Sequence, residues 1–388
     1  MKILLASSEL FPFSKTGGLA DMVGALGKAM AERGEEVYSV TPLYRGIREK
    51  FPEIQQTDIE LNLPLGTRMV ASRIWRLELE PKHSVYFIEQ PEFFDRANLY
   101  VENGADYTDN SERFIYFSKC AAHLAREVFQ VDLAHVHDWQ AGLVPLFLKD
   151  EEQRRKVPAI ASVITIHNLA FQGVFPYSDW QYTNLPNTYF TPSGVEFYGY
   201  FNCLKAGIIY SDIITTVSPR YAREILTEQY GCGLDGVLRD RQRDLIGILN
   251  GVDYSEWRTD ENPFLKHPYT AEALEGKARL KAELQQEMGL PVDAGIPLFA
   301  TISRLADQKG FDILLPALEE MISTRMQFVA LGSGNADFER GLKQLAARYP
   351  DKVAIQIGYN HGLSHRIEAG ADFFLMPSRF EPCGLNQM

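Results

Sequence analysis

The segment Lys15-Thr-Gly-Gly-Leu-Ala-Asp21 follows the opening apolar run Ile3–Ala6 and leads into a helical pattern. This order predicts a strand, a flexible loop and a helix, the building unit of α/β folds. Gly17 and Gly18 let the backbone approach a ligand closely, and the first turn of the helix offers unpaired N–H groups. With the charge of Lys15 added, the loop is typical of a phosphate site, although a lone loop lysine is usually only solvated.

A second cationic loop, Ser303–Gly310, follows another expected strand and carries Arg304 and Lys309. Two such loops in separate halves of a chain indicate a pyrophosphate held across a cleft. Neither loop matches G-x-x-x-x-G-K-S/T or G-x-G-x-x-G, so nucleoside triphosphate hydrolysis and dinucleotide redox chemistry are disfavoured. Surface ion pairs of these two cations with Asp307 or Asp312 are the alternative.

The amino-acid composition excludes several classes of binding partner and site. The 39 Lys and Arg against 51 Asp and Glu give a net charge of −12, which disfavours non-specific binding to nucleic acid or to an anionic membrane. The four cysteines form no C-x-x-C pair, so neither a zinc site nor a disulfide framework is expected. No signal-peptide pattern and no apolar stretch of about 18 residues is present, and we expect a cytoplasmic chain.

The chain alternates apolar runs with helical patterns, which predicts a mainly parallel sheet covered on both faces. The expected strands of the first half are Lys2–Ser7, Glu36–Thr41, Leu133–His137, Ala159–Ile166, Ile213–Val217 and Leu245–Leu249. The expected helices are Gly18–Arg33, Ser111–Phe129, Ala141–Asp150, Val195–Tyr210 and Pro219–Tyr230. Residues 57–90 alternate apolar and polar positions and predict inserted antiparallel hairpins.

The turn signal Asn250-Gly251-Val-Asp253 closes the first set of elements. We therefore expect a first domain over residues 1–250, a hinge over 251–270 and a second domain over 271–388. The second domain begins with a helix at Ala271–Gly289, and its strands are expected at Leu298–Ser303, Gln327–Leu331, Lys352–Ile357 and Asp372–Pro377. Doubly wound nucleotide domains usually have about five or six strands, so we expect an incomplete second domain in a C-terminally truncated chain.

Polar side chains gather where the expected strands end, which is where open α/β sheets bind ligands. In the first half these are Lys15, Asp138, His167 and Asn250, and in the second half Arg304, Lys309, Tyr359 and Glu381.

Six motifs carry a resemblance that runs from residue 1 to residue 388. They are Lys-Thr-Gly-Gly-Leu-Ala-Asp, His-Asp-Trp, Thr-Ile-His-Asn-Leu-Ala-Phe-Gln-Gly, Ile-Leu-Asn-Gly-Val-Asp, Ser-Arg-Leu-x-x-Gln-Lys-Gly and Ser-Arg-Phe-Glu-Pro-Cys-Gly-Leu. In this order and spacing they resemble bacterial glycogen synthases and plant starch synthases. The resemblance implies a GT-B fold, in which two Rossmann-like domains face a cleft. It also implies transfer of glucose from ADP-glucose to the non-reducing end of an α-1,4-glucan, with retention and without a metal or other cofactor.

The resemblance also implies residue roles. By this resemblance, the donor phosphates are bound by Lys15, Gly17, Gly18 and Asp21. The leaving diphosphate is stabilised by Arg304 and Lys309. Glu381 supports positive charge at the anomeric carbon, His167 contacts the donor glucose, and Asp138 lies by the acceptor and the reacting carbon. Asn250 is given a sugar or hinge contact, and Tyr359 and Tyr100 are given contacts with the adenine.

Each role has a plainer alternative. His167 is then a packed histidine at a strand end, Asp138 a cap on the helix near Trp139, Asn250 a turn residue and Glu381 an exposed carboxylate. Retaining transfer normally uses a carboxylate nucleophile, and no side chain stands out for that part. The sequence therefore favours a front-face route in which a donor phosphate oxygen assists the acceptor hydroxyl.

Two positions depart from the family pattern, Gln140 where many members have His and Asn386 where Thr is frequent. They leave details of the acceptor site open. Two other functions also remain open: a related retaining glycosyltransferase with a small acceptor, and a fragment that binds nucleotide or glucan without turnover.

Overall fold

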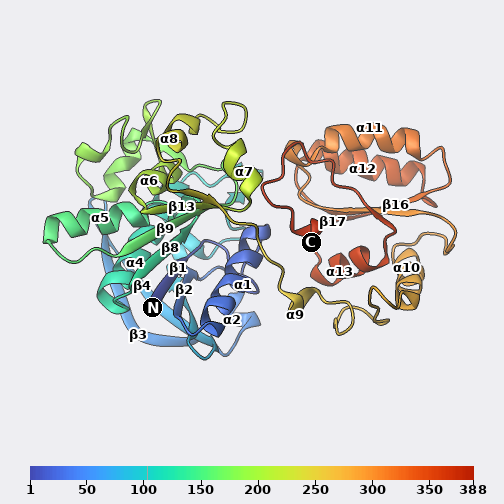
Figure 1. The fold of residues 1–388 in the computed structure, drawn as a ribbon, viewed down its shortest axis with the longest axis horizontal. Helices are drawn as coiled ribbons and strands as arrows, with labels where there is room; N and C mark the ends of the chain where they lie inside the picture. The colour runs from blue at the N-terminus through green and yellow to red at the C-terminus, as the bar shows by residue number, and fades with distance from the viewer. Residues whose placement is uncertain (103) are drawn as a thin grey trace. The chain divides into compact units, whose positions relative to one another are not determined.

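The computed structural model describes residues 1–102 and 104–388. They form two compact units: Met1–Gly251 together with Pro382–Met388, and Val252–Glu381 (Figure 1). Residues 252–270, expected as a hinge, group with the second unit, and the last seven residues group with the first. The two units are described separately below.

The first unit is built on a nine-stranded sheet with the order β14-β13-β9-β8-β1-β2-β5-β4-β3. All neighbours pair in parallel except β4, which runs antiparallel to β3 and β5. The strands are β1 (Lys2–Ala6), β2 (Glu36–Pro42), β3 (Gln55–Leu65), β4 (Arg68–Glu80), β5 (His83–Glu89), β8 (Leu133–His137), β9 (Ala161–Ile166), β13 (Ile213–Thr216) and β14 (Leu245–Gly247). Smaller strands are β6 (Val101–Glu102), β7 (Ala105–Asp106), β10 (Val174–Pro176), β11 (Glu196–Phe197) and β12 (Tyr200–Asn202).

Helices cover both faces of this sheet, and strand β1 shows why. Leu4 and Ala6 belong to the large core, whereas Ile3 and Leu5 pack in a second cluster against Leu26 and Met30 of α1. Because both faces of such a strand are buried, its sequence is a continuous apolar run, and the sheet was predicted from runs of this kind. The helices are α1 (Gly18–Glu32), α2 (Ile47–Lys50), α3 (Pro91–Phe94), α4 (Asn110–His123), α5 (Val144–Arg155), α6 (Cys203–Tyr210), α7 (Pro219–Glu224) and α8 (Asp235–Asp240).

Three predicted helices differ clearly from the structure. The helix expected over Pro219–Tyr230 is α7, which already ends at Glu224. The single helix expected over Val195–Tyr210 is wrong in its first half, where β11 and β12 form a hairpin before α6. Tyr198 and Gly199 turn the chain there with φ of 51° and 85°, a region that a helix cannot use. The helix expected over Ser111–Phe129 ends as α4 and continues as a π-helical turn, Leu124–Val128.

The second unit contains a parallel four-stranded sheet with the order β17-β16-β15-β18. Alternate residues of β16 face two cores: Phe328 and Ala330 pack toward α11 and α12, and Val329 and Leu331 pack toward α10 and α13. Figure 1 shows these helix pairs on opposite sides of the sheet. The elements are α9 (Tyr254–Trp257), α10 (Glu275–Glu287), β15 (Leu298–Ile302), α11 (Phe311–Met321), β16 (Gln327–Gly332), α12 (Ala336–Arg348), β17 (Val353–Ile357), α13 (His361–Gly370) and β18 (Phe373–Phe374). No helix among residues 1–102 and 104–388 is long and apolar enough to cross a membrane.

Candidate active site

The predicted phosphate loop of the first unit lies between β1 and α1. Lys15 Nζ donates to Asp21 Oδ1 at 2.8 Å, so the carboxylate in the first turn of α1 orients the lysine. Gly17 precedes the helix, and a Cβ built on it would meet no atom within 4 Å. Open space beside the first N–H groups of α1 suits an anion. The structure thus brings Lys15, Gly17, Gly18 and Asp21 together in one loop and helix start.

Glu9, which was not predicted as a site residue, holds this loop in place. Its buried carboxylate accepts hydrogen bonds from Thr16 N, Thr16 Oγ1 and Gly17 N at 2.5, 2.6 and 3.3 Å. It also accepts one from the Tyr100 hydroxyl at 2.8 Å. Burial raises the pKa of Glu9. Tyr100, predicted as an adenine contact, is therefore a partner of Glu9 in this structure.

Asp138 and His167 meet at the carboxyl ends of β8 and β9. The strands pair in parallel with His137 opposite Thr165, so the next residues emerge side by side. Asp138 Oδ1 accepts from His167 N at 2.7 Å. The carboxylate makes no capping bond to the 3-10 turn Trp139–Ala141, so the simple capping role is wrong.

The backbone of Asp138 has φ 54° and ψ −171°, a strained conformation for a residue other than glycine. Its side chain is buried, and burial raises the pKa of Asp138 to about 7. The fold thus maintains both a strained backbone and a costly buried acid here. Such a combination is typical of a functional position.

His137 fixes the orientation of the His167 ring. His137 Nδ1 lies 3.1 Å from His167 Nε2, and His137 Nε2 is buried without a hydrogen-bond partner in the described part of the chain. A proton on that Nε2 would leave a buried donor unpaired, which is costly. His137 therefore carries its proton on Nδ1 and donates it to His167, whose own proton lies on Nδ1.

These imidazoles stay neutral. Burial lowers the pKa of His167 to about 3 and that of His135 to about 4, and it lowers the pKa of His137 as well. His167 consequently offers a neutral ring with an Nδ1–H donor at neutral pH. This suits contact with a sugar hydroxyl and disfavours a role as a general base.

Asn250 follows β14, three residues beyond Gly247, on the segment that leads to the second unit. It lies at the β14 end of the sheet, two strands from β9. Its role stays a prediction.

In the second unit, Lys309 and Glu381 form an ion pair. Lys309 Nζ lies 2.6 Å from Glu381 Oε2, and the side chains are 18% and 16% exposed. Ser378 Oγ donates to the same carboxylate oxygen at 3.0 Å. The alternative pairing of Lys309 with Asp312 is wrong, because Asp312 pairs with Arg379.

Close backbone approaches hold the two loops together. Gly310 has φ 73°, and a Cβ on it would lie 2.1 Å from Pro377 O. Arg379 N donates to Gln308 O at 2.9 Å. Glycine at position 310 thus lets the lysine loop pack directly against the segment that carries Glu381.

Arg304 and Tyr359 follow neighbouring parts of the same sheet. Arg304 lies after β15 with its side chain exposed, and Tyr359 lies after β17 with 60% of its surface exposed. The Tyr359 hydroxyl lies 3.0 Å from His361 Nδ1. Both residues stand at the carboxyl ends of strands, as expected, with the ring of Tyr359 accessible.

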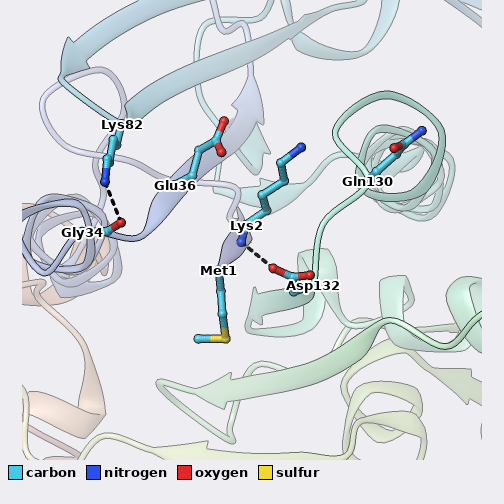
Figure 2. A pocket seen from close by; sticks show the side chains of 7 residues that line it. All are labelled: Met1, Lys2, Gly34, Glu36, Lys82, Gln130 and Asp132. Carbon is cyan, nitrogen blue, oxygen red and sulfur yellow. Dashed lines mark hydrogen bonds between the residues drawn. The ribbon is translucent and has the colours of Figure 1, made fainter.

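The predicted residues thus form two sets, one in each unit. A surface pocket of about 440 Å³ in the first unit belongs to neither set (Figure 2). Its lining residues are Met1, Lys2, Gly34, Glu36, Lys82, Gln130 and Asp132. These stand at or before the amino ends of β1, β2, β5 and β8, the sheet edge opposite Asp138 and His167.

Comparison with known proteins identifies the family. Residues 2–240 match the starch synthase catalytic domain family. The chain is 43% identical to the glycogen synthase of Opitutus terrae, and the alignment covers 100% of this chain and 82% of that protein. It is 46% identical to the glycogen synthase of an Anaeromyxobacter species, covering 100% of this chain and 81% of that protein.

Solved structures agree. The catalytic domain of starch synthase IV from Arabidopsis thaliana, bound to ADP and acarbose, superimposes with a TM-score of 0.91 at 32% identity, covering 100% of this chain and 80% of that one. Sucrose-phosphate synthase from Thermosynechococcus elongatus shares the fold alone, with a TM-score of 0.59 at 17% identity, covering 99% of this chain and 77% of that one. The chain therefore belongs to the starch synthase catalytic domain family and is a GT-B glycosyltransferase of the glycogen and starch synthase type.

Proposed function

We propose that this chain is a cytoplasmic enzyme that moves glucose from ADP-glucose to the non-reducing end of an α-1,4-glucan, with retention of configuration. The observation that supports this most is the likeness, over the whole of this chain, to a starch synthase bound to ADP and acarbose. The two sets of site residues supply the chemistry that such a transfer needs.

Each unit offers cations that suit a donor diphosphate. Lys15 stands beside the start of α1, where the helix dipole and free N–H groups favour an anion. Arg304 and Lys309 flank the corresponding loop after β15. As the bond to the sugar breaks, negative charge grows on the leaving ADP, and fixed cations stabilise that charge more than they stabilise the ground state.

Glu381 would lie near the anomeric carbon. Positive charge develops there in the transition state, and a carboxylate that is already positioned lowers its energy. In the front-face route the bond from C1 to the phosphate oxygen breaks while the acceptor oxygen bonds to C1 on the same face. The acceptor proton passes to an oxygen of the leaving phosphate, so no protein nucleophile is needed.

Asp138 and His167 would contact the sugars. The Nδ1–H of His167 suits a hydroxyl of the donor glucose, since the ring is neutral and held by His137. Asp138, with its raised pKa, would orient the acceptor hydroxyl near the reacting carbon. Asn250 and Tyr359 are proposed to contact the sugar and the adenine respectively.

The test is incorporation of labelled glucose from ADP-glucose and UDP-glucose, with glycogen or free hexoses as acceptors. We expect ADP-glucose with glycogen to give the fastest incorporation, and chelation by EDTA to leave the rate unchanged. A large preference for UDP-glucose contradicts the donor assignment, and better use of free hexoses contradicts the glucan acceptor. Loss of activity in EDTA that magnesium restores contradicts the metal-free route.

A further inference from the structure

Three potential metal ligands converge in the second unit, apart from the residues proposed for glucosyl transfer. They are Glu256 of α9 and His361 and His365 of α13, and one ligand atom from each lies within 4.8 Å of the others. Glu256 Oε1 lies 2.6 Å from His361 Nε2 and 3.6 Å from His365 Nε2, and the two Nε2 atoms are 3.4 Å apart. Ligand atoms around a tetrahedral Zn²⁺ with bonds of 2.0–2.1 Å lie about 3.3–3.4 Å apart. The two distances from His365 are close to this value, and the shorter contact between Glu256 and His361 is a hydrogen bond that a metal ion would replace.

The local structure explains how the three side chains meet. His361 and His365 are four residues apart on a ten-residue helix, so they lie on one face of it. Asn360 begins this helix by accepting from Leu363 N at 2.9 Å. Glu256 comes from 105 residues earlier in the chain, so a metal ion would join two distant segments.

The aromatic surroundings hold the ligands in position. The His365 ring is 3% exposed and stacks on Trp257 at 4.0 Å and on Phe264 at 4.9 Å between ring centres. Rings locked by packing present their nitrogens in a fixed direction, and an apolar shell limits competition from water.

We propose that Glu256, His361 and His365 bind Zn²⁺ or a similar divalent transition metal, which ties α9 to α13. Two imidazoles and one carboxylate are a donor set that zinc accepts, and three protein ligands leave a fourth position for water. The proposal does not depend on the glucosyl transfer reaction.

The groups that hydrogen-bond to the two histidines on the side away from the metal decide the affinity of the site. A metal ion on Nε2 requires each histidine to carry its proton on Nδ1. For His361 the hydroxyl of Tyr359, 3.0 Å from Nδ1, can accept that proton in a hydrogen bond.

His365 differs because of Asn262. The amide oxygen of Asn262 accepts from Phe264 N at 2.9 Å, so its Nδ2 faces His365 Nδ1 at 3.0 Å. Without metal, His365 therefore carries its proton on Nε2. Metal binding must move this proton to Nδ1 and turn an oxygen of residue 262 toward it. Asn262 thus weakens the site, and Asn262→Asp, which offers an oxygen on that side, is expected to strengthen it.

The experiment is titration of the whole chain with Co²⁺, followed by visible absorption, and then displacement by Zn²⁺. We expect one equivalent of Co²⁺ to bind with the absorption of a four- or five-coordinate site. Glu256→Gln and His361→Gln should weaken binding by more than about 100-fold, because losing a metal ligand costs more than losing a hydrogen-bond partner of a ligand. Asn262→Asp should tighten it about 10-fold.

His267→Gln is the matched control, since His267 lies 3.4 Å from Glu283 and this pair belongs to no group of three potential ligands among the described residues. It should bind Co²⁺ as the natural chain does. The proposal is overturned if the natural chain binds no Co²⁺, if the ligand variants bind as tightly as the control, or if Asn262→Asp fails to tighten binding. Because that last variant is expected to gain affinity, unfolding cannot imitate the expected result.

Discussion

Lys309 and Glu381 lie 72 residues apart in the sequence, yet their side chains form an ion pair of 2.6 Å in the second unit. The proposed phosphate-binding cation and the proposed carboxylate beside the sugar are therefore direct neighbours. A bound diphosphate would share Lys309 with Glu381. When the donor binds, Lys309 therefore neutralises less of the negative charge of Glu381, and this charge acts more strongly on the sugar. Donor binding is in this way linked to transition-state stabilisation.

Lys309→Ala should lower kcat by about 10²–10³, because it removes a fixed charge that stabilises the leaving diphosphate. The melting temperature should change little, since a partly exposed ion pair contributes only about 0–1 kcal/mol. Lys343→Ala is the matched control, as Lys343 pairs with Glu339 at 3.6 Å on the surface of α12. An equal kcat in the two variants would show that Lys309 is an ordinary surface lysine without a role in catalysis.

Glu381→Gln should remove most glucosyl transfer while donor affinity stays nearly unchanged. The amide keeps the shape of the side chain but loses the negative charge opposite the developing positive centre. Calorimetric titration with ADP-glucose, alongside kcat, separates the two effects. A loss of affinity equal to the loss of rate would mean that Glu381 acts on the ground-state sugar.

His137→Leu should lower kcat by up to about 100-fold, because the His167 ring loses the hydrogen bond that orients it. His137→Asn keeps an N–H donor near the position of Nδ1 and should retain more activity. The ¹⁵N chemical shifts of His167 should show its proton on Nδ1 in the natural chain and a mixture of tautomers in His137→Leu. Equal activity in both variants, with an unchanged His167 spectrum, would contradict the positioning role.

Asp138→Asn should stabilise the first unit at pH 8 while it removes activity. Burial raises the pKa of Asp138 to about 7 from its ordinary value near 3.8, so ionisation opposes folding. That cost is absent at low pH and grows as the pH rises from about 4 to about 7. At about 1.4 kcal/mol per pKa unit, and allowing for one weakened hydrogen bond, the gain is on the order of 1–3 kcal/mol. Urea unfolding at pH 4 and pH 8 measures it, and an equal stability difference at both pH values would refute it.

The buried neutral histidines predict instability in acid. Burial lowers the pKa of His83 to about 4, whereas the unfolded chain takes up a proton near pH 6.5. Stability that is fully present above pH 6.5 is therefore lost as the pH falls toward 4, by up to about 1.4 kcal/mol per pH unit for each such histidine.

His83→Gln tests this effect away from the site, because His83 contacts Ser39 at 2.9 Å at the amino end of β5. Its unfolding free energy should depend less on pH between 6.5 and 4.5 than that of the natural chain. Parallel pH profiles for the two proteins would show that His83 is not held neutral.

Local patterns predicted the sheets well, because buried parallel strands read as apolar runs and glycine loops mark their ends. The first helix was predicted to begin at Gly18, where α1 begins. Residues 57–90 were predicted to be hairpins, but the pattern could not show that β3 and β4 extend the same sheet through β5. A sequence also has no signal for the positive φ of Tyr198, which separates β11 from β12.

Contacts between distant segments explain what was missed in the sites. Glu9 matters because the loop folds back onto its carboxylate, and nothing in a strand-end glutamate indicates that. His361 and His365 were not singled out in the sequence, and their partner Glu256 lies more than a hundred residues away from them. The sequence motifs thus pointed to the predicted catalytic residues. The residues that position them could be recognised only in the folded chain.

The most direct measurement counts ADP released and glucose incorporated into glycogen in one reaction, for the natural chain, Asp138→Asn and Lys309→Ala. The account predicts one ADP per glucosyl residue added, new linkages that β-amylase removes, and loss of both products in each variant, because one residue comes from each unit. ADP release without growth of the glucan would identify a hydrolase. Undiminished incorporation in either variant would contradict the proposal that residues of both units take part in the transfer.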